Sequence, residues 1–181
     1  MTDEAPNETS MTPSLFVAIL EKAMPAAKKL RTFGLGVEEI NDIQRTFKAV
    51  KRPRAHLTQC RNELDELLVE YDCSSVAIGP ITFLEVPVVS EYGTMIGHCE
   101  ADPIVVLDDG TVVMCDHEKL SHQLVCAANS GHFLDALAEF VRIVKDRKSW
   151  ERRSIEAADA CARLAGGEKC RPFFQSICGF L

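Results

Sequence analysis

Cysteine, histidine and aspartate gather in two short stretches in the middle of the chain. His98 and Cys99 are adjacent, and Cys115, Asp116 and His117 form the second stretch. Two chemistries use such a set: zinc coordination by thiolate and imidazole, or a nucleophilic thiol paired with histidine. No Cys-x-x-Cys pair occurs among the eight cysteines, and single cysteines are common in buried strands. We therefore expect no metal, no cofactor and no catalytic residue, with a Cys/His-dependent enzyme or a zinc protein as an alternative.

A β-hairpin is expected to position these groups. The β-branched runs 103–108 and 111–117 are separated by Asp109-Gly110, a pair that favours a two-residue type I′ turn. In that register Asp102 lies opposite His117. Both faces of the hairpin are apolar, so we expect it to lie deep in a sheet.

The same register predicts which side chains of the hairpin share a face. One face carries Leu107, Val112, Val105 and Met114, and the other carries Ile104, Val106, Val113 and Cys115. After a further strand at 123–128, Asn129 or Ser130 can cap a helix with a continuous apolar stripe. The stripe consists of Phe133, Leu134, Leu137, Phe140, Val141 and Val144. The first face of the hairpin is expected to share one core cluster with Leu134, Leu137 and Val141.

Further helices and strands flank this unit. Residues 13–30 read as a helix that kinks or ends near Met24, because Pro25 disfavours helical geometry in the residue before it. Helical spacing continues over 37–50, and 62–71 reads as a short helix with Glu63, Asp65, Glu66 and Glu70 outward.

The strands and the last helices complete the expected set of elements. Residues 76–89 form strands broken at Gly79-Pro80, and a turn at Tyr92-Gly93 leads into a strand at 94–99. Two helices end the chain, one over 150–165 with Ile155, Ala158, Cys161 and Leu164 on its apolar face, and one from Pro172 onward.

These elements predict an α+β fold, a mainly antiparallel sheet covered by helices, with extra helices at both termini. The expected divisions are a disordered tail at 1–12, an N-terminal helical extension at 13–35, the α+β domain at 36–148 and a C-terminal helical extension at 149–181. With 181 residues, no export signal and no stretch of roughly 20 apolar residues, we expect a cytoplasmic protein with reduced thiols.

Charge is distributed unevenly along the chain. No Lys or Arg lies between Arg61 and Lys119, and those 57 residues carry 13 acidic ones. Such a segment makes nucleic acid a poor partner, because phosphates are bound by cations. It predicts an acidic surface that either serves only solubility or binds a protein. The candidate partner-binding residues lie at strand ends and at the hairpin tip: Glu100, Asp102, Asp108, Asp109, Asp116 and Glu118.

Three segments carry a resemblance to a known family. They are Val-Glu-Glu-Ile at 37–40, Asp-Asp-Gly-Thr-Val-Val at 108–113 with Cys-Asp-His at 115–117, and Ala-Ala-Asn-Ser at 127–130 leading into the helix. Over about 110 residues the chain resembles the SUKH superfamily, which includes bacterial immunity proteins and fungal cell-wall regulators. The resemblance implies an α+β domain that binds without catalysis, and its typical bacterial member blocks a competitor's toxin.

Charge and resemblance together predict a non-catalytic protein-binding domain. We expect an immunity-type protein whose acidic surface neutralises a basic toxin, such as a nuclease with a cationic active site. Neither a membrane nor a nucleic acid is an expected partner. The alternative is an assembly or regulatory subunit that acts through its apolar C-terminal helices, for example as a homodimer.

Overall fold

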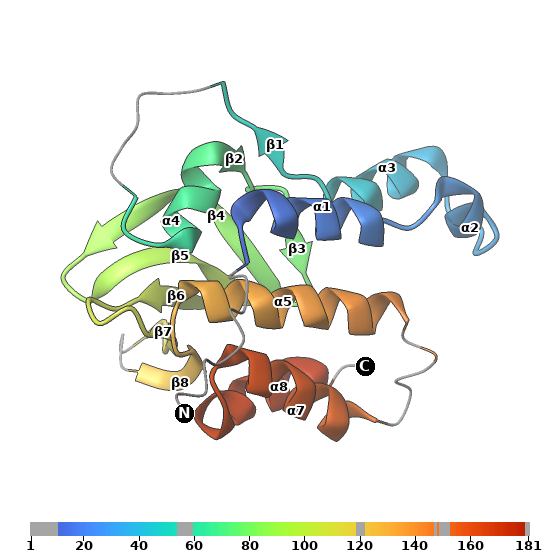
Figure 1. Ribbon diagram of the computed structural model, residues 1–181. Coiled ribbons are helices and arrows are strands. Elements are labelled where there is room, and N and C mark those ends of the chain that lie inside the picture. The colour runs from blue at the N-terminus through green and yellow to red at the C-terminus, as the bar shows by residue number, and fades with distance from the viewer. Residues whose placement is uncertain (1–10, 54–59, 119–121, 147, 149–152, 180–181) are drawn as a thin grey trace, which may run out of the picture.

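The computed structural model describes residues 11–53, 60–118, 122–146, 148 and 153–179. Most of the expected tail lies outside these ranges, as do Trp150, Phe180 and Leu181 of the expected C-terminal helices. The fold is α+β, as predicted: a curled six-stranded antiparallel sheet is flanked by helices from both ends of the chain (Figure 1).

The large sheet is a meander in which each strand pairs with the next. Its strands are β3 (Ala77–Ile78), β4 (Ile81–Ser90), β5 (Gly93–Cys99), β6 (Asp102–Val106), β7 (Val112–Cys115) and β8 (His122–Ala127). The predicted break at Gly79-Pro80 is confirmed as the turn between β3 and β4. A second, two-stranded sheet pairs β1 (Val50–Lys51) with β2 (Tyr71–Asp72).

The predicted turn between β6 and β7 is wrong by one residue. The N–H of Leu107 donates to the carbonyl of Thr111 at 2.9 Å, so the loop is Asp108-Asp109-Gly110. Gly110 has a φ of +88°, and a three-residue loop ending in a left-handed glycine is the next most common hairpin connection. The strands consequently pair Ile104 with Met114 and Val106 with Val112.

This one-residue shift exchanges the faces of β6. Ile104, Val106, Val112 and Met114 join the main core together with Leu134, Leu137 and Val141. Val105, Val113 and Cys115 form a separate small cluster on the other face, with Met95 and Leu107 packed against it. The predicted common cluster is therefore right for the helix and for β7, and wrong for Val105 and Leu107.

Most of the helices follow the predicted start and stop signals. α1 (Pro13–Ala23) ends before Pro25, as predicted, and α2 (Ala27–Arg31) follows it. Asn129 caps α5 (Ser130–Lys145), one of the two predicted caps, by accepting from the N–H of His132 at 2.9 Å, whereas Asn62, expected inside the helix, caps α4 (Glu63–Glu70). Toward the C-terminus lie α7 (Ser154–Ala165), the short 3₁₀ helix η1 (Glu168–Cys170) and α8 (Arg171–Cys178).

Four predicted helical faces need correction, one of them on α5, where Val144 is 40% exposed. α3 (Val37–Arg45) is shorter than expected, because Thr46 ends it and the chain then turns into β1, leaving Val37 and Val50 exposed. Asp65 is buried, because its carboxylate accepts from the backbone N–H of Arg61. On α7, Ile155 and Leu164 face solvent, while the helix packs through alanines and Cys161.

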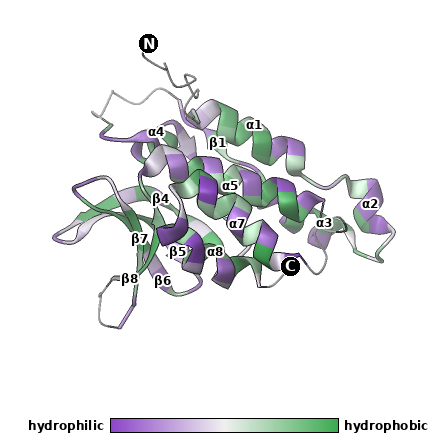
Figure 2. Cartoon of the chain, turned by 60° about the horizontal axis from the view of Figure 1, so that its bottom comes forward, coloured by the Kyte–Doolittle hydropathy of each residue, from purple (hydrophilic) through white to green (hydrophobic). Residues whose placement is uncertain are grey.

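One continuous core joins α1, α4, α5, α7 and α8 to a single face of the sheet. Figure 2 shows hydrophobic and hydrophilic residues sharing the surfaces of α1, α5 and α7, as expected of helices that cover a core. Phe133 of α5 contacts Phe173 of α8, with ring centroids 6.3 Å apart. Because Phe173, Phe174 and Ile177 are buried in the chain's own core, the described apolar stripe of α8 is already covered.

Candidate functional site

The six predicted partner-binding residues do not form one patch. Asp108 and Asp109 lie in the turn between β6 and β7. Glu100, Asp102, Asp116 and Glu118 lie at the opposite end of the same strands. Since β6 has five residues and a strand rises about 3.4 Å per residue, the two groups are roughly 15 Å apart or more. The expected compact acidic cluster is therefore divided in two.

The end of the sheet that carries Asp108 also carries the turn between β4 and β5. Ser90 pairs with Gly93 around this turn, and Thr94 pairs with Val106 near the end of β6. Two strand spacings, about 10 Å, thus separate the two turns. In Figure 1 both turns lie on the same side of the sheet, and Gly110 of the turn between β6 and β7 lines a hollow with Asn62 and Asn129 at the starts of α4 and α5.

Large apolar side chains are exposed at this end, a feature that was not predicted. Val88 is 45% exposed, Val89 is 70% exposed and Tyr92 is 46% exposed. We call Val88, Val89, Glu91, Tyr92, Asp108 and Asp109 together the hairpin-tip surface, in which Val88 and Val89 are consecutive in β4 and face opposite sides of the sheet. Exposed apolar side chains grouped within acidic ones are typical of protein-binding surfaces.

The open edge of β4 explains why these valines are exposed. Among the described strands, β3 pairs with β4 only at Ile81 and Thr82, so the rest of β4 has a neighbour only on the β5 side. The pairing with β5 also shifts register between Phe83 and Val88. Pro87 has no N–H to offer at this edge, and such edge features limit uncontrolled strand pairing.

The charged side chains of the hairpin-tip surface are acidic. A hydrogen bond with Glu91 and the charge of that carboxylate raise the pKa of Tyr92. Asp109 Oδ1 accepts from the N–H of Thr111 at 2.9 Å and thereby supports the turn. One cation reaches β4 further back: Arg52 Nη2 donates to the carbonyl of Glu85 at 2.6 Å.

At the other end of the strands, the acidic residues make local contacts. Asp102 Oδ1 lies 2.7 Å from His117 Nδ1 and also accepts from the backbone N–H of His117 at 3.3 Å. The predicted meeting of Asp102 and His117 is thus confirmed although the register was not. This hydrogen bond, together with the charges of Asp102, Asp116 and Glu118, raises the pKa of His117.

Glu100 and Asp116 shape the turns at that end. Glu100 has a φ of +56°, and its N–H donates to the carbonyl of Pro80 at 2.9 Å. Asp116 Oδ1 accepts from the N–H of Glu118 at 2.8 Å. These contacts give the acidic residues structural roles in the connections of the sheet.

The cysteines near this end favour neither of the two chemistries considered above. Burial, followed by the charges of Glu100 and Asp102, raises the pKa of Cys99 to about 11. Burial and the charge of Asp102 also raise the pKa of Cys115. A thiol with a raised pKa carries little nucleophilic thiolate near neutral pH. Within the described part of the chain, no three His, Cys, Asp or Glu side chains are arranged to hold a metal ion.

Comparisons with protein families, with curated proteins and with solved structures found no match for this chain. In the described ranges, no helix combines the length and the apolar character needed to cross a membrane.

Proposed function

We propose that the protein is a non-catalytic protein-binding domain and that the hairpin-tip surface binds a basic partner protein. The observation that carries this proposal is that Val88, Val89 and Tyr92 are exposed at the same end of the sheet as Glu91, Asp108 and Asp109. Apolar side chains supply most of the free energy of association through burial. Acidic side chains around them favour a partner of opposite charge and speed its encounter.

The position of this surface also supports a binding role. The helices cover the core face of the sheet, and the turn between β4 and β5 lies at one end of that sheet, while Gly110 of the other turn lies near the starts of α4 and α5. A partner can therefore reach Val89 and Tyr92 without displacing any element of the described core.

The resemblance to the SUKH superfamily suggests the biological class of this partner. In that interpretation the partner is a basic toxin domain, and the chain is an immunity-type protein that occupies its cationic surface. This part of the proposal rests on the resemblance, whereas the binding surface rests on the exposed residues.

Photo-crosslinking from two matched aromatic positions tests the proposal. A benzoylphenylalanine replaces Tyr92 in one variant and Phe33 in the other; Phe33 is 69% exposed in the link between α2 and α3. Crosslinked products are isolated from the source cells and identified by mass spectrometry. We expect a basic protein to be joined to residue 92 and not to residue 33. Equal products at both positions, or an acidic protein at residue 92, would contradict the proposal.

A further inference from the structure

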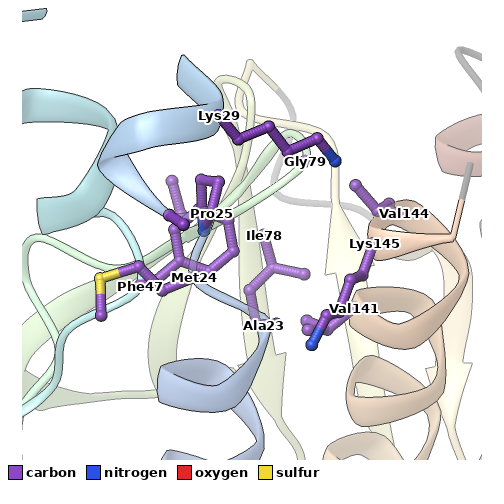
Figure 3. A pocket seen from close by; sticks show the side chains of 12 residues that line it. Ala23, Met24, Pro25, Lys29, Phe47, Ile78, Gly79, Val141, Val144 and Lys145 are labelled. Atoms are coloured by element: carbon purple, nitrogen blue, oxygen red, sulfur yellow. The ribbon is translucent and has the colours of Figure 1, made fainter. Parts of the chain in front are cut away.

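The helical side of the molecule contains an apolar pocket of about 460 Å³ that is separate from the hairpin-tip surface. Its walls come from the link between α1 and α2, from β3 and from the last turns of α5 (Figure 3). Met24, Pro25, Ile78 and Val141 supply apolar lining. This volume lies within the range of roughly 300–1,000 Å³ that is usual for small-molecule sites.

The pocket exists because of particular residues in its walls. Pro25 ends α1 and turns the chain away from α5, and its carbonyl accepts a hydrogen bond from Gln44 Nε2 at 2.9 Å. Gly79 has a φ of +59°, and a Cβ at this position would lie 3.0 Å from Phe140. The hydrogen bond to Pro25 and the close approach of Gly79 to Phe140 thus place two of the walls.

Two lysines lie at the pocket, and none of its lining residues is acidic. Figure 3 shows Lys29 extending from α2 across the opening toward Val144 on α5. Lys145 Nζ donates to the carbonyl of Lys22 at 2.7 Å and keeps further N–H groups. No ion pair of Lys29 or Lys145 occurs among the described residues.

We propose that this pocket binds a single aliphatic carboxylate of medium chain length, its chain among Ile78 and Val141 and its carboxylate beside Lys29. Each methylene buried in such a lining favours binding through the hydrophobic effect. The ammonium group of Lys29 complements the carboxylate, whereas a cationic ligand would be repelled. This inference does not depend on the proposed protein-binding function, because it uses different residues.

The inference is tested by adding decanoate below its micellar concentration. Calorimetry measures its binding, and NMR records the methyl signals of Ile78, Val141 and Val144. We expect one decanoate per chain, shifts at these methyl groups, and weaker binding of decanol and decylamine. Lys29→Gln should weaken decanoate binding about two- to fivefold, as expected for a partly exposed ion pair. Lys28→Gln is the matched control on the same helix and should leave the affinity unchanged.

A second pair of variants tests the apolar part of the site. Val144 lies at the rim of the pocket. Val144→Phe should weaken decanoate binding at least about tenfold, because the phenyl ring fills space that two methylene groups of decanoate would occupy. Val37→Phe, on the exposed face of α3, is its control. Ala26→Phe gives a second blocking position if Val144→Phe does not fold.

Several results would overturn the inference. One is the absence of shifts at Ile78 and Val141 at the highest decanoate concentration. A second is binding of decanol as tight as that of decanoate, because the lysines would then contribute nothing to binding of the carboxylate. A third is Lys29-dependent binding to anionic lipid vesicles without binding of monomeric decanoate, because the ligand would then be a membrane surface.

Discussion

Two valine-rich hairpins of the same sheet differ sharply in what surrounds them. Val105, Val106, Val112 and Val113 in β6 and β7 are buried, each 5% exposed or less. Val86, Val88 and Val89 in β4 are each at least 45% exposed. The residue type is the same, so composition does not explain the difference. β6 and β7 each have a strand on both sides, whereas most of β4 has a neighbour only on the β5 side among the described strands.

The comparison indicates that the two hairpins have different roles. Burial of β6 and β7 stabilises the fold, because their side chains contact both the helix layer and the small cluster on the other face. The exposed valines of β4 contribute little to that burial. Their retention at the surface is consistent with the proposed binding role.

The largest expected effect distinguishes the hairpins by stability. Ile104→Ala should lower the free energy of unfolding by about 2–5 kcal/mol, because Ile104 is fully buried in β6. Val89→Ala, the control in β4, should change it by less than about 0.5 kcal/mol. Urea denaturation of both variants measures the difference. Equal losses would mean that β4 is as deeply packed as β6 and would remove the comparison.

A smaller effect is expected in the turn of the buried hairpin. Gly110→Ala should destabilise the protein by about 1–2 kcal/mol, because Gly110 has a φ of +88° that alanine rarely adopts. Space is not the reason, since a Cβ would meet no atom within 4 Å. Gly110→Asn should destabilise less, because asparagine tolerates this conformation. If Gly110→Ala leaves the free energy of unfolding unchanged, residue 110 does not have a positive φ and the turn is of a different type.

The smallest effect concerns the end of the strands opposite the hairpin-tip surface. We expect His117 to titrate above its ordinary pKa, because Asp102 bonds to the charged imidazole. The bond between protonated His117 and Asp102 therefore contributes fully to stability below the pKa of His117 in the unfolded chain. This contribution is lost as the pH rises through the pKa of His117 in the folded chain. NMR titration of His117 measures the shift, and Asp102→Asn should bring the pKa down. A pKa that is unchanged in Asp102→Asn would show that this carboxylate does not hold the imidazolium.

The elements with specific local chemistry could be predicted from the sequence. Asn129 caps a helix, Pro25 ends one, and Gly79-Pro80 separates two strands, each for a reason that depends on nearby residues alone. The α+β class followed from their order. The length of α3 could not be predicted, because Val50 continues the helical spacing but pairs with β2 instead.

The register of β6 and β7 was missed for a physical reason. Asp109-Gly110 fits both a two-residue turn and the end of a three-residue loop, since the glycine adopts a left-handed backbone conformation in each. Alternation usually decides between registers, but both faces of this hairpin are apolar, so the pattern favoured neither. The six acidic residues were grouped wrongly, although the predicted hairpin already placed Asp108 and Asp109 at its tip and Asp102, Asp116 and Glu118 at its other end.

The exposed valines were missed because an edge depends on tertiary structure. A signal was present in Pro87, since proline within a strand run indicates an edge or a bulge. Its neighbours Val86, Val88 and Val89 then become candidates for exposure. The apolar pocket had no local signal, because its lining comes from segments far apart in the chain.

The central claim is that the hairpin-tip surface, and not acidity in general, binds the partner. Its most direct test is the association rate of the partner captured through residue 92, measured across ionic strengths for Asp108→Asn and Asp116→Asn. These variants remove the same charge at opposite ends of the β6–β7 hairpin. The account predicts that Asp108→Asn slows association about two- to fivefold at low salt and flattens the salt dependence, while Asp116→Asn leaves both unchanged. Equal slowing by the two variants, or a rate that ignores salt and both substitutions, would contradict it.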